Sequence, residues 1–285
     1  MRRLSFAAAL ALSLAASASP ATASVTIGQT ASSPPSLATG GPYDLVQASL
    51  ASGNGYVVPA NGTLSWTLTS WSTYANASGG MLGMKIFRPL GAATYQAVAH
   101  DGPRLLNPSV LNTFTGLGIQ VKPGDVLGDT TPALPSGSAT AVFLGMPGDQ
   151  NVFRDALADG ASGAFLDDDP GYRVDISAVI TPTNAFAPGT VSLNKKKGTA
   201  TLAFGLPNPG DLSGSGRGAQ VASAGAVSSR PVPAGIATLV VKAKGKRKRK
   251  LIKQGKVKLS LAITYTPAGG DPNTESVKVK LKKRL

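Results

Sequence analysis

Alternating apolar and polar residues run through most of the chain and predict β-strands. The segment GTLSWTLTSW (62–71) places its leucines and first tryptophan on one face, with threonine and serine between them. The segments YRVDISAVI (172–180) and KVKLSLAITY (256–265) alternate in the same way, and Gly, Pro and Asn residues separate the runs. Many short strands with frequent turn signals are typical of a β-sandwich or a jelly roll.

The pattern favours a helix in one place only, NVFRDALADG (151–160), ending at Gly160. Further strands are expected at VTIG (25–28), GYVVP (55–59) and MLGMKIFRP (81–89). Six or seven strands in the last 97 or so residues would fit an immunoglobulin-like sandwich. The predicted fold class is therefore all-β.

The first 23 residues have the pattern of a signal peptide. Two arginines precede a short apolar run, and Ala21-Thr22-Ala23 forms an A-x-A cleavage site. The run is too short to cross a bilayer as a helix, and no second apolar run of membrane length follows. We expect an exported chain that is soluble or peripherally attached. It contains no cysteine, so its stability must come from its core and not from disulfides.

Charge divides the chain into two parts. Residues 24–188 hold six Lys/Arg and eleven Asp/Glu, whereas residues 189–285 hold twenty Lys/Arg and three Asp/Glu. So abrupt a change suggests a domain boundary near residues 181–190. The expected organisation is a signal peptide (1–23), a linker-like segment (24–42), a jelly-roll-like β-sandwich (43–183) and a basic immunoglobulin-like β-sandwich (189–285).

Four segments carry a resemblance: GTLSWTLTSW, KIFRP (85–89), VKPGDVLG (121–128) and YRVDISA (172–178). They resemble a β-sandwich module of uncharacterised secreted proteins from actinobacteria. The C-terminal segment is similar to a second module that ends such proteins. The resemblance implies an architecture, two sandwiches on an exported chain, and no activity.

The sharpest local feature is a basic run with no acid in it. Nine of the fifteen residues from 242 to 256 are cationic: Lys242, Lys244, Lys246, Arg247, Lys248, Arg249, Lys250, Lys253 and Lys256. It lies between two predicted strands, so we expect a loop presented by the C-terminal sandwich. Dense cationic charge attracts an anionic cell-envelope polymer or an extracellular polysaccharide. No aromatic residue is interleaved and no DNA-reading motif is present, which argues against sequence-specific nucleic-acid binding. A solvated surface without a partner is the alternative.

Two other patterns suggest binding sites. Trp71 is out of phase with the apolar face of its strand and lies near Tyr74, so the two could form a sugar-binding surface. Asp167, Asp168 and Asp169 could supply oxygen ligands to calcium, although neither an EF-hand nor a calcium repeat is present. The alternative for the acidic triplet is a solvated loop.

Little in the chain suggests catalysis. His100 is the single histidine and could pair with Asp101, but no G-x-S-x-G motif completes a triad. The sole glutamate is Glu275, so a glycosidase carboxylate pair is not indicated. The segment SGSGRGAQ (213–220) lacks the Gly-Lys-Ser/Thr ending of a phosphate loop. No cofactor is expected. The sequence thus predicts an exported, non-enzymatic structural or adhesive protein, with a carbohydrate-binding N-terminal sandwich as the alternative.

Overall fold

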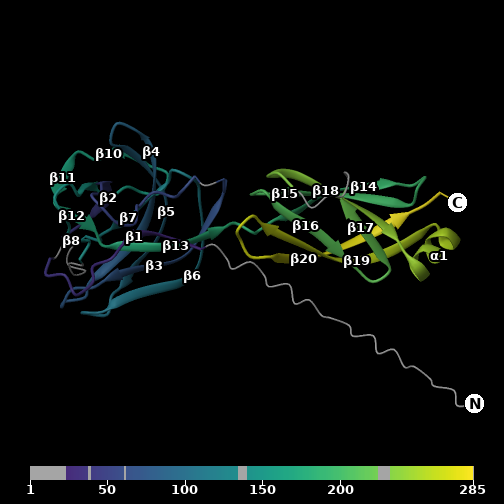
Figure 1. Cartoon of the computed structure of the whole chain (residues 1–285), viewed down its shortest axis with the longest axis horizontal. Coiled ribbons are helices and arrows are strands. Elements are labelled where there is room, and N and C mark those ends of the chain that lie inside the picture. Colours follow the sequence, from purple (N-terminus) through teal and green to yellow (C-terminus); the bar gives the residue numbers. More distant parts are fainter. Residues whose placement is uncertain (1–23, 38–39, 61, 134–139, 224–231, 285) are drawn as a thin grey trace, which may run out of the picture.

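In the computed structural model, two β-rich units lie end to end, with the C-terminus at the far tip of the second (Figure 1). The structure describes residues 24–284 except 38–39, 61, 134–139 and 224–231. The expected signal peptide at 1–23 lies outside the described residues.

The N-terminal unit is built from two main antiparallel sheets with the orders β1-β13-β3-β6 and β10-β5-β4-β7-β2-β9-β11, and the pair β12-β8. The strands are β1 (Val25–Gln29), β2 (Tyr43–Ser49), β3 (Trp66–Tyr74), β4 (Met81–Gly91), β5 (Thr94–Leu105), β6 (Leu111–Val121), β7 (Val126–Thr130), β8 (Val142–Leu144), β9 (Gln150–Asp155), β10 (Ser162–Ala164), β11 (Asp167–Pro170), β12 (Tyr172–Val174) and β13 (Ile176–Pro182). The inward residues of these sheets, such as Trp66, Leu68, Ile86 and Ile176, form one buried core.

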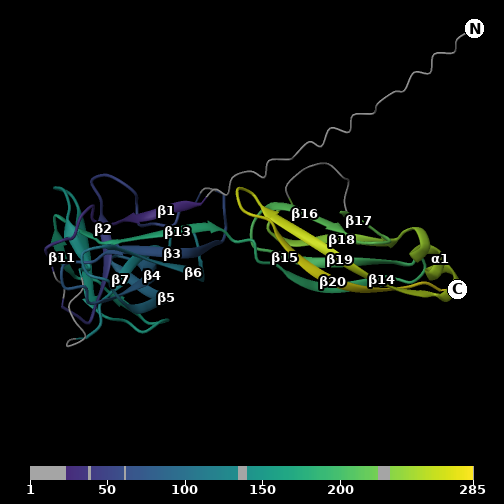
Figure 2. The same cartoon turned by 90° about the horizontal axis from the view of Figure 1, so that it is seen from below.

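The C-terminal unit has its own core between a four-stranded sheet, β14-β15-β18-β17, and a three-stranded sheet, β16-β19-β20 (Figure 2). Its elements are β14 (Ala187–Asn194), β15 (Thr199–Leu206), β16 (Gly210–Ser215), β17 (Ala219–Ser223), β18 (Gly235–Ala243), α1 (Gly245–Gln254), β19 (Lys256–Pro267) and β20 (Asn273–Lys282). Val257, Leu259, Leu261 and Ile263 alternate inward along β19, as the sequence pattern predicts.

The all-β class is confirmed. Two local expectations are wrong: the helix expected at 151–160 and the loop expected in the basic run. The helix expected at 151–160 is not formed: residues 150–155 are β9, which pairs with β2 on one side and β11 on the other, and residues 156–160 are irregular. Sheet hydrogen bonding on both edges outweighs the helical spacing of a short segment. The helix α1 lies instead in the basic run, where a loop was expected.

In the segment 24–42, which was expected to be linker-like, residues 25–31 are part of the N-terminal unit. The strand β1 pairs along its length with β13, and Ile27 is buried in the core. The Ala31 amide donates to the Asp175 carboxylate at 2.9 Å. In contrast, GYVVP forms no strand, only a single bridge between Val57 and Val126.

A buried asparagine joins the two units. The Oδ1 atom of Asn208 accepts hydrogen bonds from the Leu64 and Ser65 amides, both at 2.8 Å. Its Nδ2 atom donates to the Ser65 and Thr183 carbonyls at 2.8 and 3.1 Å. The Tyr265 hydroxyl in turn donates to the Asn208 carbonyl at 2.7 Å, which ties this contact to the core of the C-terminal unit.

Within the described residues, α1 is far too short and polar to cross a bilayer, and no other helix meets the requirement.

Candidate polyanion-binding surface

The nine cations of the basic run are distributed over three elements at the tip of the C-terminal unit. Lys242 lies near the end of β18, Lys244 is the N-cap of α1, and Lys256 begins β19. The other six lie on α1: Lys246, Arg247, Lys248, Arg249, Lys250 and Lys253. All nine side chains are exposed.

The helix forms here because its C-terminal end is capped and one side chain anchors it. Lysine, arginine and leucine have good helix propensity. Leu251 is buried in the core of the C-terminal unit, and Gly255 ends the helix with φ of 65°, its amide donating to the Leu251 carbonyl at 2.9 Å. A left-handed residue in this position is the usual helix C-cap.

The charges of α1 oppose its own dipole. The first turn carries Lys246, Arg247 and Lys248 and no acid, and no side chain caps its free amides. Cations near the positive end of a helix are unfavourable, as are like charges four residues apart, such as Lys246 and Lys250. An anion beside this end of α1 would therefore stabilise it.

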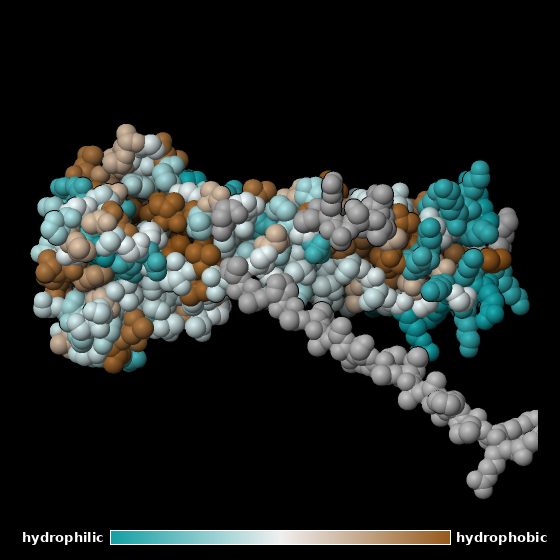
Figure 3. Space-filling model, in the orientation of Figure 1, coloured by the Kyte–Doolittle hydropathy of each residue, from teal (hydrophilic) through white to brown (hydrophobic). Residues whose placement is uncertain are grey.

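Sequence reasoning missed the other cations at this tip, because they are far away in the chain. The turn between β14 and β15 contains Lys195, Lys196 and Lys197, and the Lys195 carbonyl accepts a hydrogen bond from the Arg284 amide at 2.9 Å. The Lys283 amide donates to the Gly255 carbonyl at 2.7 Å. We call Lys195, Lys196, Lys197, Lys283 and Arg284, together with the basic run, the basic tip. Figure 3 shows its long hydrophilic side chains gathered at one end of the molecule.

A cationic pocket of about 620 Å³ opens between α1 and the β16–β17 connection. Its lining is Arg217, Gly218, Lys244, Gly245, Lys246, Arg247 and Lys250. The Lys244 amide donates to the Gly218 carbonyl at 2.8 Å, which holds the connection against the helix. The glycine-rich segment around Arg217, which lacks the ending of a phosphate loop, thus joins two different sheets and lies beside the basic tip.

The acids of the C-terminal unit lie at its other end. Asp211 is opposite Thr266, Glu275 is opposite Ile263, and the Asp271 carbonyl accepts a hydrogen bond from Asn184 in the chain that links the units. No acidic residue lies in α1 or in the half of β19 that follows it. The basic tip is consequently a surface of one sign.

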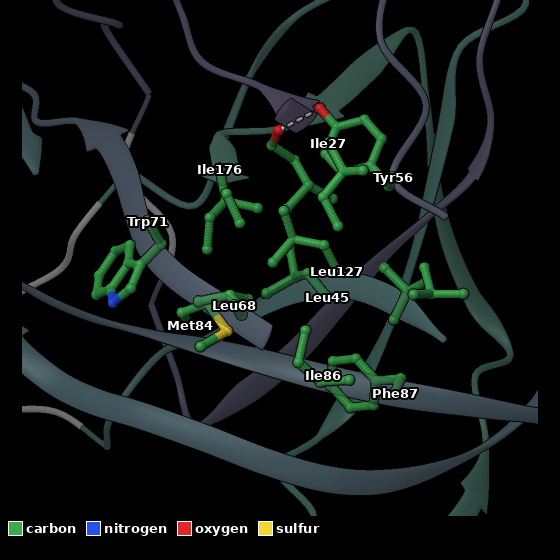
Figure 4. Packing of buried hydrophobic residues seen from close by; sticks show 14 of the residues in the cluster. Ile27, Leu45, Tyr56, Leu68, Trp71, Met84, Ile86, Phe87, Leu127 and Ile176 are labelled. Atoms are coloured by element: carbon green, nitrogen blue, oxygen red, sulfur yellow. Dashed lines mark hydrogen bonds between the residues drawn. The ribbon is translucent and has the colours of Figure 1, made fainter. Parts of the chain in front are cut away.

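The expected exposure of Trp71 is wrong. Trp71 is fully buried and lies among the other core side chains (Figure 4). Its Nε1 donates to the Asp101 carboxylate at 2.7 Å. The cause is a β-bulge: Leu68 pairs with Ile180 and Ser70 with Val179, so Thr69 is an extra residue that shifts the alternation by one. With Trp71 inside and Tyr74 only half-exposed, the two cannot form the proposed sugar-binding surface.

A different aromatic pocket, of about 350 Å³, lies on the N-terminal unit. Tyr43, Phe153 and Tyr172 line it, together with Asp169. The rings of Tyr43 and Phe153 meet edge to face, with centroids 5.6 Å apart. Burial, with the nearby Asp168 charge, raises the pKa of Asp169.

The acidic triplet is a strand and not a solvated loop. Asp167, Asp168 and Asp169 belong to β11, so successive side chains point to opposite faces of the sheet. Asp168 accepts a hydrogen bond from the Gln150 side chain. In the described part of the chain, no three His, Cys, Asp or Glu residues are grouped to hold a metal ion. This geometry gives the calcium hypothesis no support.

His100 pairs with Asp159 and not with Asp101. Its Nδ1 lies 2.8 Å from the Asp159 carboxylate on the surface. Asp101 is engaged by Arg104 and Trp71, and the Arg104 guanidinium lowers the pKa of its carboxyl. The His100–Asp101 pair considered from the sequence is therefore not formed.

No protein-family model matches the chain, and no curated protein matches it either. The resemblance to a secreted actinobacterial module stays a prediction from the four segments that suggested it.

Proposed function

We propose that this chain is an exported, non-enzymatic structural or adhesive protein, held on anionic envelope or matrix polymer by the basic tip. In this proposal the N-terminal unit is a jelly-roll-like sandwich that faces outward, and the C-terminal unit is an immunoglobulin-like sandwich that docks. The observation that carries it is the separation of charge within the C-terminal unit, with cations at the free end and acids at the junction.

The position of the basic tip supports the proposal. It is the end of an elongated molecule, so a flat or fibrous anionic surface can reach it without meeting the N-terminal unit (Figure 1). A field from clustered cations raises the local concentration of polyanions and depends strongly on salt. Nothing in this arrangement requires a chemical reaction.

The test is a salt wash of cells that export the chain. We expect the protein to be released between about 0.2 and 1 M salt, where screening shortens the reach of charges to a few ångströms. Replacing the nine cations of the basic run by Gln should release it at lower salt. The control is Lys122→Gln, which removes an exposed cation from the N-terminal unit. If neither salt nor the nine substitutions changed the retention of the protein on the cells, the proposal would be refuted.

The aromatic pocket favours a second candidate, carbohydrate binding by the N-terminal unit. Partly exposed Tyr and Phe rings with one carboxyl beside them suit the apolar face and the hydroxyls of a sugar ring. Tyr172→Ala should abolish signals on a glycan array, whereas Tyr74→Ala, in β3 and outside this pocket, should leave them unchanged. An array without any glycan signal for the unaltered chain would eliminate this candidate.

A further inference from the structure

Five lysines form a cationic ladder on the outer face of the three-stranded sheet. They are Lys256 and Lys258 on β19 and Lys278, Lys280 and Lys282 on β20. Lys256 lies directly opposite Lys282, Lys258 opposite Lys280, and Ser260 opposite Lys278. Residues directly opposite on paired strands share a face, and all five side chains are exposed.

The ladder is regular because a β-sheet fixes its spacing. Alternate residues of one strand are about 6.8 Å apart, and opposite residues are about 5 Å apart across the pair. Two parallel rows of ammonium groups therefore follow the strands on a rigid surface.

Like charges directly opposite each other destabilise a sheet. Lysines on an outer strand protect its edge from pairing with another chain, which accounts for β20. Edge protection does not call for matching lysines on β19, which is the middle strand of the sheet. A bound anion would offset the repulsion in both rows.

No acid competes for these lysines along the same face. Beyond Lys258 the face continues with Ser260, Ala262 and Thr264, and Asp211 is the first acid on it, opposite Thr266. That acid is six residues along β19 from Ser260, the partner of Lys278, about 20 Å away. The face also presents no aromatic residue on which a base could stack.

The cations of α1 make a shorter row. Lys246, Arg249, Lys250 and Lys253 follow a spacing of three, four and seven residues and share one face of the helix, over about 10 Å of its axis. This row lies on a helix with a single buried side chain, whereas the ladder lies on a hydrogen-bonded sheet.

We propose that the ladder, which adjoins the basic tip at Lys256, is the binding track of the C-terminal unit and that its ligand is an extended phosphodiester chain, held through its phosphates alone. This inference rests on the proposed function and names the ligand class of that surface. When three carbons join two phosphates, six bonds separate the two phosphorus atoms. An extended chain of six bonds spans about 7 Å, which is twice the span of the three bonds of one peptide unit. That repeat matches the spacing of the ladder. Lysine recognises phosphate as a point charge, without the planar geometry that arginine imposes.

The experiment compares two variants that lose the same charge. The ladder variant carries Lys258→Thr, Lys278→Thr and Lys280→Thr, which keep strand propensity. The helix variant carries Lys246→Gln, Lys248→Gln and Arg249→Gln, which keep helix propensity. Thermal unfolding verifies that both fold. Two labelled twelve-phosphate probes, oligothymidylate and an abasic chain with three-carbon spacers, are titrated by fluorescence anisotropy between about 50 and 200 mM salt.

With the unaltered chain, we expect both probes to bind with affinities within about twofold, because a phosphate-only track ignores bases. The ladder variant should reduce the log–log salt slope by about 2, the value for three lost phosphate contacts on a single strand, and the helix variant by less than about 1. Equal losses in the two variants, much tighter binding of oligothymidylate, or no binding of either probe would overturn the track.

The probe titration and the salt wash test the ladder and the proposed function separately. Salt-sensitive retention on cells combined with equal losses in the two variants would remove only the ladder. Salt-insensitive retention would remove the envelope proposal even if the ladder bound both probes.

Discussion

Asp129 is a buried carboxyl without a hydrogen-bond partner among the described residues. Both of its oxygens are inaccessible, on the core face of β7 beside Leu45 and Met84. Burial raises its pKa well above the usual range, and the nearby Asp175 and Asp44 charges act in the same direction. Desolvation likewise raises the pKa of Asp175 to about 7. Both groups hold protons more tightly in the folded than in the unfolded chain.

We predict that the N-terminal unit loses stability as the pH rises from about 4 to 8. The favourable contribution of a carboxyl with a raised folded pKa is complete below its unfolded pKa and is lost as pH climbs through the folded pKa. Asp129→Asn should raise the urea midpoint at pH 8 and change it little at pH 4. Urea unfolding at the two pH values measures this.

The control for this prediction is Asp155→Asn, which alters an exposed carboxyl on β9 and should change the urea midpoint little. A urea midpoint of Asp129→Asn that falls below that of the unaltered chain at pH 8 would contradict the prediction.

At the scale of the element, α1 depends on Leu251 and on its C-terminal cap. Leu251 is its one buried side chain, and its many cations repel one another and its dipole. Its position between β18 and β19 is fixed by Leu251 and by the left-handed Gly255. Salt should strengthen this helix, because screening weakens the repulsion.

We predict that Gly255→Ala destabilises α1 by about 1 kcal/mol, since an alanine is strained at positive φ. Hydrogen exchange of the amides of 249–254 should accelerate, and salt or a bound polyanion should restore part of the protection. Gln254→Ala, an exposed change one residue earlier that favours helix, is the matched control. Unchanged exchange in Gly255→Ala would show that Leu251 alone holds the helix.

At the scale of the whole molecule, Asn208 fixes one unit to the other. Its side-chain amide makes four hydrogen bonds to backbone groups of the N-terminal unit or of the connecting chain. Thr183, which accepts one of them, also bonds Ser65 and Gln120 through its hydroxyl. This network holds the basic tip at a defined distance from the N-terminal unit.

We predict that Asn208→Ala loosens this junction while each unit stays folded. Unsatisfied buried backbone groups cost about 1–3 kcal/mol each, so the junction should open to water. Small-angle X-ray scattering should show a broader distribution of interatomic distances. Asn208→Asp, which can accept but not donate, should give a distribution between those of the unaltered chain and of Asn208→Ala. An unchanged distribution in Asn208→Ala would mean that the connecting chain alone holds the units.

The sequence by itself determined the all-β class, the inward alternation of strands such as β19 and the division of charge, because these depend on period and composition. The tertiary structure decided what depends on pairing between distant segments. A bulge in β3 turned Trp71 inward, pairing on both sides made β9 a strand, and the core contact of Leu251 made the basic run a helix. The ladder depends on the register of β19 with β20, and the basic tip on turns that are far apart in the chain, so neither could be derived from local pattern.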